Sequence, residues 1–109
     1  MSGITTHVLD AVLGKPAAGI PVRLERKEGA AWAEVASGAT DADGRCRDLA
    51  QSAKPGIYRM TFDVAAYLQQ KGRTSIYPEI SIAFICDGEA HYHLPLLLCD
   101  NSYTAYRGS

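Results

Sequence analysis

Turn-forming residues interrupt this chain roughly every ten residues, and this spacing limits the possible folds more than any other feature of the sequence. Several of the segments between turns alternate apolar and polar residues, which is typical of strands with one buried and one exposed face. In residues 20–26, for example, Ile20, Val22 and Leu24 share one face, and Arg23 and Glu25 share the other. The pattern predicts an all-β fold of two packed sheets.

The expected strands cover residues 4–13, 20–26, 32–39, 57–62, 79–86 and 90–98. Residues 41–44 have the composition of a tight turn, because aspartates bond to nearby backbone amides and glycine adopts a positive φ. Pro95 has no amide hydrogen, so we expect it to face an edge, a bulge or a gap in strand pairing.

One segment has the period of a helix rather than that of a strand. From residue 63 to residue 71 the apolar residues Val64, Tyr67 and Leu68 recur at the spacing i, i+3, i+4, which predicts a helix of about two turns. Asp63 can cap its start, and Gly72 can take the left-handed position after its end.

The length of 109 residues predicts one domain, residues 1–109, with little volume to spare for a deep cavity. A small-molecule site is therefore expected to be shallow or shared between subunits. The 11 Lys and Arg residues do not exceed the 12 Asp and Glu residues, which argues against nucleic acid as a partner.

No signal peptide is recognisable, and the most apolar stretch, residues 94–99, is too short to span a membrane. The three cysteines have neither disulfide-framework nor zinc spacing, so we expect reduced thiols and a cytoplasmic protein. Cys99 is better explained as a small core or edge residue than as a nucleophile.

The three histidines are the residues best suited to proton transfer at neutral pH. His7 shares a strand face with Thr5 and Leu9, and it is either catalytic or a partly buried residue bonded to a neighbouring strand. His91 and His93 also share a face. They could bind a metal together with a third ligand, or simply lie on the surface.

Two further segments carry polar groups suited to a ligand. Arg45 and Arg47 follow the turn at residues 41–44, where a fixed guanidinium could hold a carboxylate or a planar polar ligand, although solvated charges are common there. The tail, residues 106–109, gathers a phenol, a guanidinium and a hydroxyl, which are useful only if the tail is held in place.

These motifs together resemble the transthyretin-like proteins. The matching segments are ITTHVLD at residues 4–10, GKPA at 14–17, TDADGR at 40–45, HYHLPLLL at 91–98 and YTAYRGS at 103–109. The final YRGS and the histidine at position 93 are similar to the 5-hydroxyisourate hydrolase branch and unlike the hormone-carrying transthyretins.

The resemblance implies a transthyretin-like (prealbumin-like) two-sheet β-sandwich with one short α-helix. It implies hydrolysis of 5-hydroxyisourate by opening of a ring amide, a step of urate degradation, with no cofactor and no metal. It also implies a homotetramer, a dimer of dimers, with sites in a channel at the dimer–dimer interface. A shared site agrees with the small volume of the chain.

The family's catalytic residues fall on His7, Arg45, His93 and Ser109 of this sequence. Its substrate-binding residues fall on His7, Arg45, Tyr106, Arg107 and Gly108. The resemblance assigns the arginine to Arg45 rather than Arg47 and leaves open which histidine is the base. The sequence departs from the family at Leu94, Cys99, Thr104, Ala105 and the connector at residues 100–102, and none of these changes removes a proposed catalytic group.

Two other functions remain as alternatives. The first is a non-catalytic carrier that binds a small aromatic ligand in the channel between subunits, although a polar histidine lining argues against it. The second is a metal-binding module built on His91 and His93.

Overall fold

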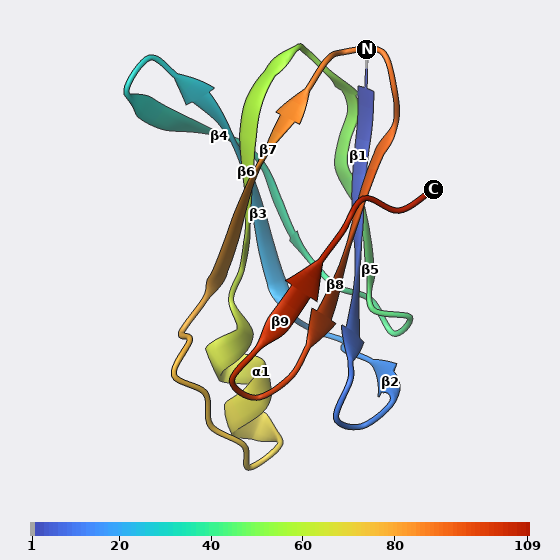
Figure 1. Ribbon diagram of the computed structural model, residues 1–109, viewed down its shortest axis with the longest axis vertical. Helices are drawn as coiled ribbons and strands as arrows, with labels where there is room; N and C mark the ends of the chain where they lie inside the picture. The colour runs from blue at the N-terminus through green and yellow to red at the C-terminus, as the bar shows by residue number, and fades with distance from the viewer. Residues whose placement is uncertain (1) are drawn as a thin grey trace.

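Two β-sheets pack against each other in the computed structural model of the protein, which describes residues 2–109, the side chain of Asp48 excepted (Figure 1). One sheet contains β1 (Ser2–Asp10), β2 (Lys15–Pro16), β5 (Arg45–Ala53), β8 (Tyr92–Leu98) and β9 (Tyr103–Ala105). The other contains β3 (Pro21–Glu28), β4 (Ala31–Ala39), β6 (Gly56–Phe62) and β7 (Ile80–Cys86). The helix α1 (Val64–Gln70) lies at one end of the sandwich (Figure 1). The predicted β-sandwich with one short helix is confirmed.

Strand β1 divides its side chains strictly between the core and the outer face of its sheet. Ile4, Thr6 and Val8 are buried, whereas Thr5 and His7 are half-buried. Burial of the apolar side chains drives the strand against the second sheet, because apolar surface is more stable away from water. The same packing therefore fixes Thr5 and His7 on the outer face.

The neighbours of β1 determine what surrounds these two side chains. β1 pairs in parallel with β8, which places Thr5 opposite His93 and His7 opposite Pro95. On its other side β1 pairs antiparallel with β5, which places His7 opposite Arg45. Segments far apart in the sequence thus meet around the middle of β1.

Several strand boundaries differ from the expectation. The strand predicted to run to residue 13 ends at Asp10, because the chain turns there and Gly14, at φ 69°, donates its amide to the Asp10 carbonyl. β2, β5 and β9 were not predicted. β5 escapes the pattern because its sequence is largely polar and its pairing with β1 has two register shifts.

Helix α1 follows its prediction closely. Val64, Tyr67 and Leu68 are its buried residues, and Gly72 has the left-handed φ of 71°. Asp63 is the residue before the helix, but its side chain makes no capping hydrogen bond. Among residues 2–109, no helix is long and apolar enough to span a membrane.

Pro95 lies where strand pairing is interrupted, as expected. β9 pairs with Leu96–Leu98 of β8 and stops before Pro95. The Pro95 carbonyl accepts the amide of Tyr106 at 3.3 Å, and the proline nitrogen faces the same side of the strand. The side of Pro95 that lacks an amide hydrogen therefore faces the tail and not a paired strand, so no strand carbonyl is left without a hydrogen-bond donor.

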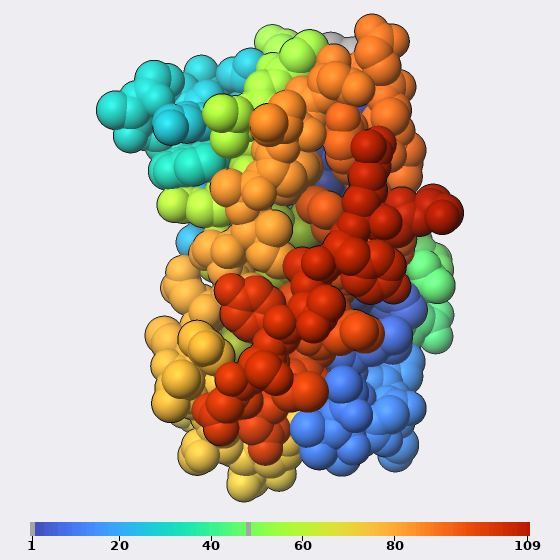
Figure 2. All heavy atoms as spheres, viewed as in Figure 1, coloured from blue at the N-terminus to red at the C-terminus, as the bar shows by residue number. Residues whose placement is uncertain are grey.

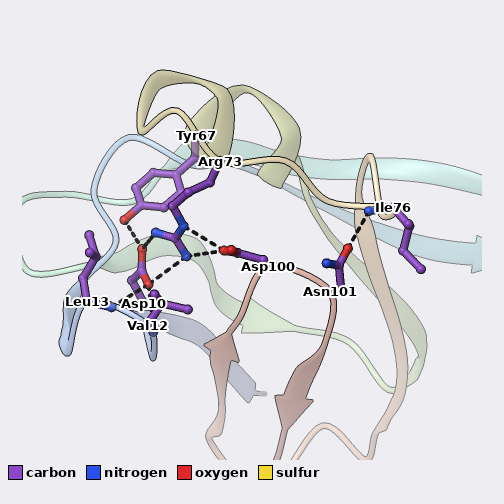
Figure 3. A network of polar contacts seen from close by, with 8 residues as sticks. All are labelled: Asp10, Val12, Leu13, Tyr67, Arg73, Ile76, Asp100 and Asn101. Atoms are coloured by element: carbon purple, nitrogen blue, oxygen red, sulfur yellow. Dashed lines mark hydrogen bonds and ion pairs between the residues drawn. The ribbon is translucent and has the colours of Figure 1, made fainter.

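A buried ion pair ties β1 to the helix end of the sandwich (Figure 3). The Asp10 carboxylate, which is fully buried, accepts hydrogen bonds from Arg73 at 2.6 Å and from the Tyr67 hydroxyl at 2.8 Å. Arg73 also donates from Nε to Asp100, in the connector between β8 and β9, at 2.7 Å. One guanidinium thus joins β1 to the segment that leads into the C-terminal tail.

The charges of this network depend on each other. Burial raises the pKa of Asp10, whereas the hydrogen bonds from Arg73 and Tyr67 lower it. The net result is a pKa below the ordinary value. Burial and the Asp10 carboxylate raise the pKa of Tyr67 to about 12. Because the folded-state pKa of Asp10 is lowered, its contribution is present above the unfolded pKa of about 3.9 and is lost as the pH falls below it.

Replacing Arg73 by methionine leaves the buried Asp10 carboxylate without its cation. We expect Arg73→Met to lower the free energy of unfolding by about 3–5 kcal/mol at pH 7. The loss should shrink as acid protonates Asp10. Urea denaturation at a fixed protein concentration measures both effects.

The matched control is Arg59→Met, which removes a more exposed pair with Glu25 on the other sheet and the contact of the Arg59 guanidinium with the Trp32 ring, 4.4 Å from its centre. That substitution should lower the free energy of unfolding by about 1–2 kcal/mol. Equal losses for the two variants would contradict the importance of the buried pair.

Candidate functional site

A cavity of about 530 Å³ lies beside β1 where three strands and the C-terminal tail meet. Every residue that lines it is polar or charged. They are Thr5, Thr6, Arg45, Arg47, His91, His93 and Ser109. A cavity with this lining suits a small polar molecule better than an apolar one.

The turn before β5 fixes the backbone of Arg45. Gly44, at φ 76°, donates its amide to the Asp41 carbonyl, and the Asp41 carboxylate accepts the amides of Asp43 and Arg45 at 2.9 and 3.0 Å. The hydrogen bond from the Arg45 amide has the largest effect on the pKa of Asp41, and it lowers that pKa together with the bond from the Asp43 amide. The pKa lies below its ordinary value although desolvation raises it. Arg45 thus leaves a rigid turn opposite His7.

The tail is held against β8 by its backbone. Gly108 donates its amide to the His93 carbonyl at 2.8 Å. A Cβ atom at position 108 would lie 2.7 Å from His93 Cδ2, so only glycine allows this approach. The tail, drawn in red, runs across the visible face of the molecule in Figure 2. This attachment brings Ser109 to the cavity.

The three histidines make different contacts. Nε2 of His7 lies 2.8 Å from the Asp43 carbonyl, and since a carbonyl only accepts, this nitrogen carries the hydrogen. The Thr5 hydroxyl lies 2.9 Å from Nδ1 of His93 and 3.1 Å from Nε2 of His91. Nε2 of His93, at the far end of the ring, is left for other partners.

The surroundings of His93 favour its neutral form. Burial lowers the pKa of His93 below its ordinary value, and the positive charges of Arg45, His7 and His91 lower it further. At neutral pH the ring is therefore uncharged and can accept a proton.

The structure brings together only part of the predicted site. Arg45, His93 and Ser109 line the cavity, and Gly108 contacts the His93 ring. His7 lies on the same face of β1 as Thr5 but does not line the cavity within one chain. Tyr106 and Arg107 do not line it either. Tyr106 is 51% exposed, and the Arg107 guanidinium stacks 4.4 Å from the centre of the Tyr92 ring.

The cavity is also lined by Thr5, Thr6, Arg47 and His91, which are not among the site residues that the resemblance assigns. For two of them, Thr5 and Arg47, the sequence pattern could have predicted the location. Thr5 lies two residues before His7 and Arg47 lies two residues after Arg45, so strand periodicity puts each on the same face as its neighbour.

The structure gives no support to the metal module on His91 and His93. Both rings point a nitrogen at the Thr5 hydroxyl. Within the described part of the chain, no three His, Cys, Asp or Glu side chains are grouped as a metal site requires.

A second cavity, of about 570 Å³, lies against the other sheet. Its charged lining residues are Arg23, Glu34, Asp63 and Glu79, and no histidine lines it. Although it is slightly larger, it lacks a group that exchanges protons near neutral pH. The chemistry therefore favours the smaller cavity.

Comparisons with known proteins point to one family. The profile described as the HIUase/Transthyretin family matches residues 4–108. A 5-hydroxyisourate hydrolase of Mus musculus is 42% identical over 99% of this chain and 96% of its own length. The enzyme of the same name from Salmonella typhimurium is 41% identical over 97% of this chain and 80% of its own length.

Solved structures agree. The 5-hydroxyisourate hydrolase of Klebsiella pneumoniae superimposes with a TM-score of 0.89 at 36% identity over 100% of both chains. A sea bream transthyretin in complex with thyroxine superimposes with a TM-score of 0.93 at 32% identity, over 97% of this chain and 94% of its own.

The electrostatics of the cavity can be tested without substrate. Replacing Arg45 by methionine removes a positive charge that disfavours the protonated His93 ring. We expect the pKa of His93 to rise towards the ordinary value of about 6.5. An NMR titration of the histidine ring protons measures the shift. Arg23→Met, on the other sheet, should leave the His93 titration unchanged, and an equal shift in both variants would contradict the specific effect of the Arg45 charge on His93.

Proposed function

The chain belongs to the HIUase/Transthyretin family, and on this premise we propose that it hydrolyses 5-hydroxyisourate to 2-oxo-4-hydroxy-4-carboxy-5-ureidoimidazoline in urate degradation. The relatives named for this activity match essentially the whole chain. The observation that carries the proposal is the meeting of Arg45, His93 and Ser109 at one polar cavity.

The reaction adds water to a ring amide. A histidine, from the coupled pair His7 and His93, takes a proton from water while the oxygen bonds to the amide carbon. Arg45 stabilises the negative charge that develops on the carbonyl oxygen. When the carbon–nitrogen bond breaks, the nitrogen leaves with the proton held by the histidine. Ser109 orients the water or the histidine. The neutral state favoured for His93 supports its part in this pair.

Tyr106, Arg107 and Gly108 complete the proposed substrate-binding set. Gly108 acts through its close approach to His93. Tyr106 seats the substrate ring from a facing protomer, since its side chain is exposed and outside the cavity of its own chain. The Arg107 guanidinium stacks on the Tyr92 ring, so it must move away from that ring to contact the substrate.

These placements favour a homotetramer, a dimer of dimers with its sites at the dimer–dimer interface. The cavity lies beside the outer-face residues of β1, where a second copy can close it. Residues 1–109 form a single hydrolase domain in this proposal, and the protein acts in the cytoplasm. Its partner is a small molecule rather than a nucleic acid or a membrane. The near-neutral charge of -1 supports the choice of partner.

A non-catalytic carrier is the second candidate, because the chain also superimposes on a transthyretin in complex with thyroxine. The histidines and arginines of the cavity argue against it. An apolar aromatic ligand would strip water from these groups without replacing their hydrogen bonds.

An ultraviolet assay of freshly generated 5-hydroxyisourate tests the proposal. The protein should accelerate loss of the substrate above the spontaneous rate. His93→Ala and Arg45→Met should each lower kcat/KM by about 100-fold or more, because they remove proton transfer and charge stabilisation respectively.

Arg59→Met, outside the cavity, serves as the control and should retain the wild-type rate. A wild-type rate no faster than the spontaneous reaction would contradict the hydrolase. Tight binding of an iodinated aromatic compound without turnover would favour the carrier.

A further inference from the structure

We propose that Thr5 and His91 form a proton relay that moves positive charge from His93 to the protein surface during the reaction. The inference rests on the proposed hydrolase function and adds two residues to it. Neither residue touches the reacting atoms in this account, because both act through His93.

The Thr5 hydroxyl lies between two imidazole rings. Its oxygen lies 2.9 Å from Nδ1 of His93 and 3.1 Å from Nε2 of His91. A hydroxyl has one hydrogen to donate, so both contacts are satisfied when it accepts from one ring and donates to the other. This arrangement forms a directional chain of two hydrogen bonds.

The direction of the chain determines what His93 can do. When His93 donates from Nδ1 to Thr5 and Thr5 donates to His91, Nε2 of His93 is free to accept a proton. The opposite direction places a hydrogen on Nε2 and removes the base. The proposed resting state therefore runs from His93 through Thr5 to His91.

The rings of His93 and His91 differ in their surroundings. His93 is half-buried, and it lines the same cavity as Arg45 and Arg47 from β5 and Ser109 from the tail. The charge of His7, on β1, also acts on the His93 ring. A second proton on this ring is costly, because two arginines line the same cavity. His91 is exposed, so water can solvate its positive charge.

The protons balance over one turnover. As water adds to the amide carbon, its proton goes to Nε2 of His93. The Nδ1 proton of His93 passes to the Thr5 oxygen while the Thr5 proton passes to Nε2 of His91, which becomes the cation. When the carbon–nitrogen bond breaks, Nε2 of His93 gives its proton to the leaving nitrogen and the two transfers reverse. The new carboxylic acid loses its proton to solvent.

Gly3 lies beside the ring of His91. Gly3 follows the same outward alternation of β1 as Thr5. A Cβ atom at position 3 would lie 2.6 Å from Nδ1 of His91, so a larger residue would push the ring from its place beside Thr5. The strand thus leaves space for His91 where the relay requires it.

Substitutions at Thr5 test the relay because valine keeps the shape of threonine without its hydroxyl. We expect Thr5→Val to lower kcat by about tenfold with little change in KM. This loss is smaller than the whole usual contribution of acid–base catalysis, because His93 itself is retained. Thr5→Ser should recover most of the lost kcat. Thr61→Val, which removes a bonded hydroxyl on the other sheet, should behave as wild type.

Rescue by a small base separates a relay from a purely structural role. His91→Ala should lower kcat, and added imidazole should restore much of it by accepting the proton from Thr5. The double variant Thr5→Val/His91→Ala should not respond to imidazole. Circular dichroism and gel filtration confirm that each variant is folded and assembled.

An unchanged kcat in Thr5→Val, or equal rescue of the single and double variants, would overturn the relay. Both outcomes require an active wild-type protein, so they leave the hydrolase standing. A wild type without activity would instead refute the proposed function itself.

Discussion

The parallel pairing of β1 with β8 holds the polar cavity in place. Alternate side chains of β1, among them Ile4 and Val8, are buried in the core, so the strand cannot slip by one residue without exposing them. The same register sets Thr5 opposite His93. The apolar packing of the sandwich thus specifies the arrangement of polar groups on the outer face of the sheet.

The far end of β1 is secured by charge. Asp10 is bonded to Arg73, which also bonds to Asp100 in the connector that leads into β9. From β9 the tail returns to the His93 carbonyl through Gly108. The buried ion pair and the cavity are therefore linked through one strand and one connector.

The sequence was most informative where one segment alone carries the signal. The periodicity of α1 and the turn before Arg45 are local, and both were predicted. β5 was missed because it is polar and bulged, and Thr5 was missed because its partners His91 and His93 lie 86 and 88 residues away. Arg107 stays a predicted substrate-binding residue, and its stacking on Tyr92 could not be foreseen because it depends on a packing contact that no local pattern encodes.

The cavity between Arg45, His93 and Ser109 is the proposed substrate site, on a scaffold shared with a transthyretin that binds thyroxine. A crystal structure with urate, a stable planar analogue of the substrate, tests this directly. We expect urate in this cavity, with a polar edge against Arg45 and a second protomer covering its open side. Urate in the cavity beside Arg23 and Glu34 instead, or no bound urate at saturating concentration, would contradict it.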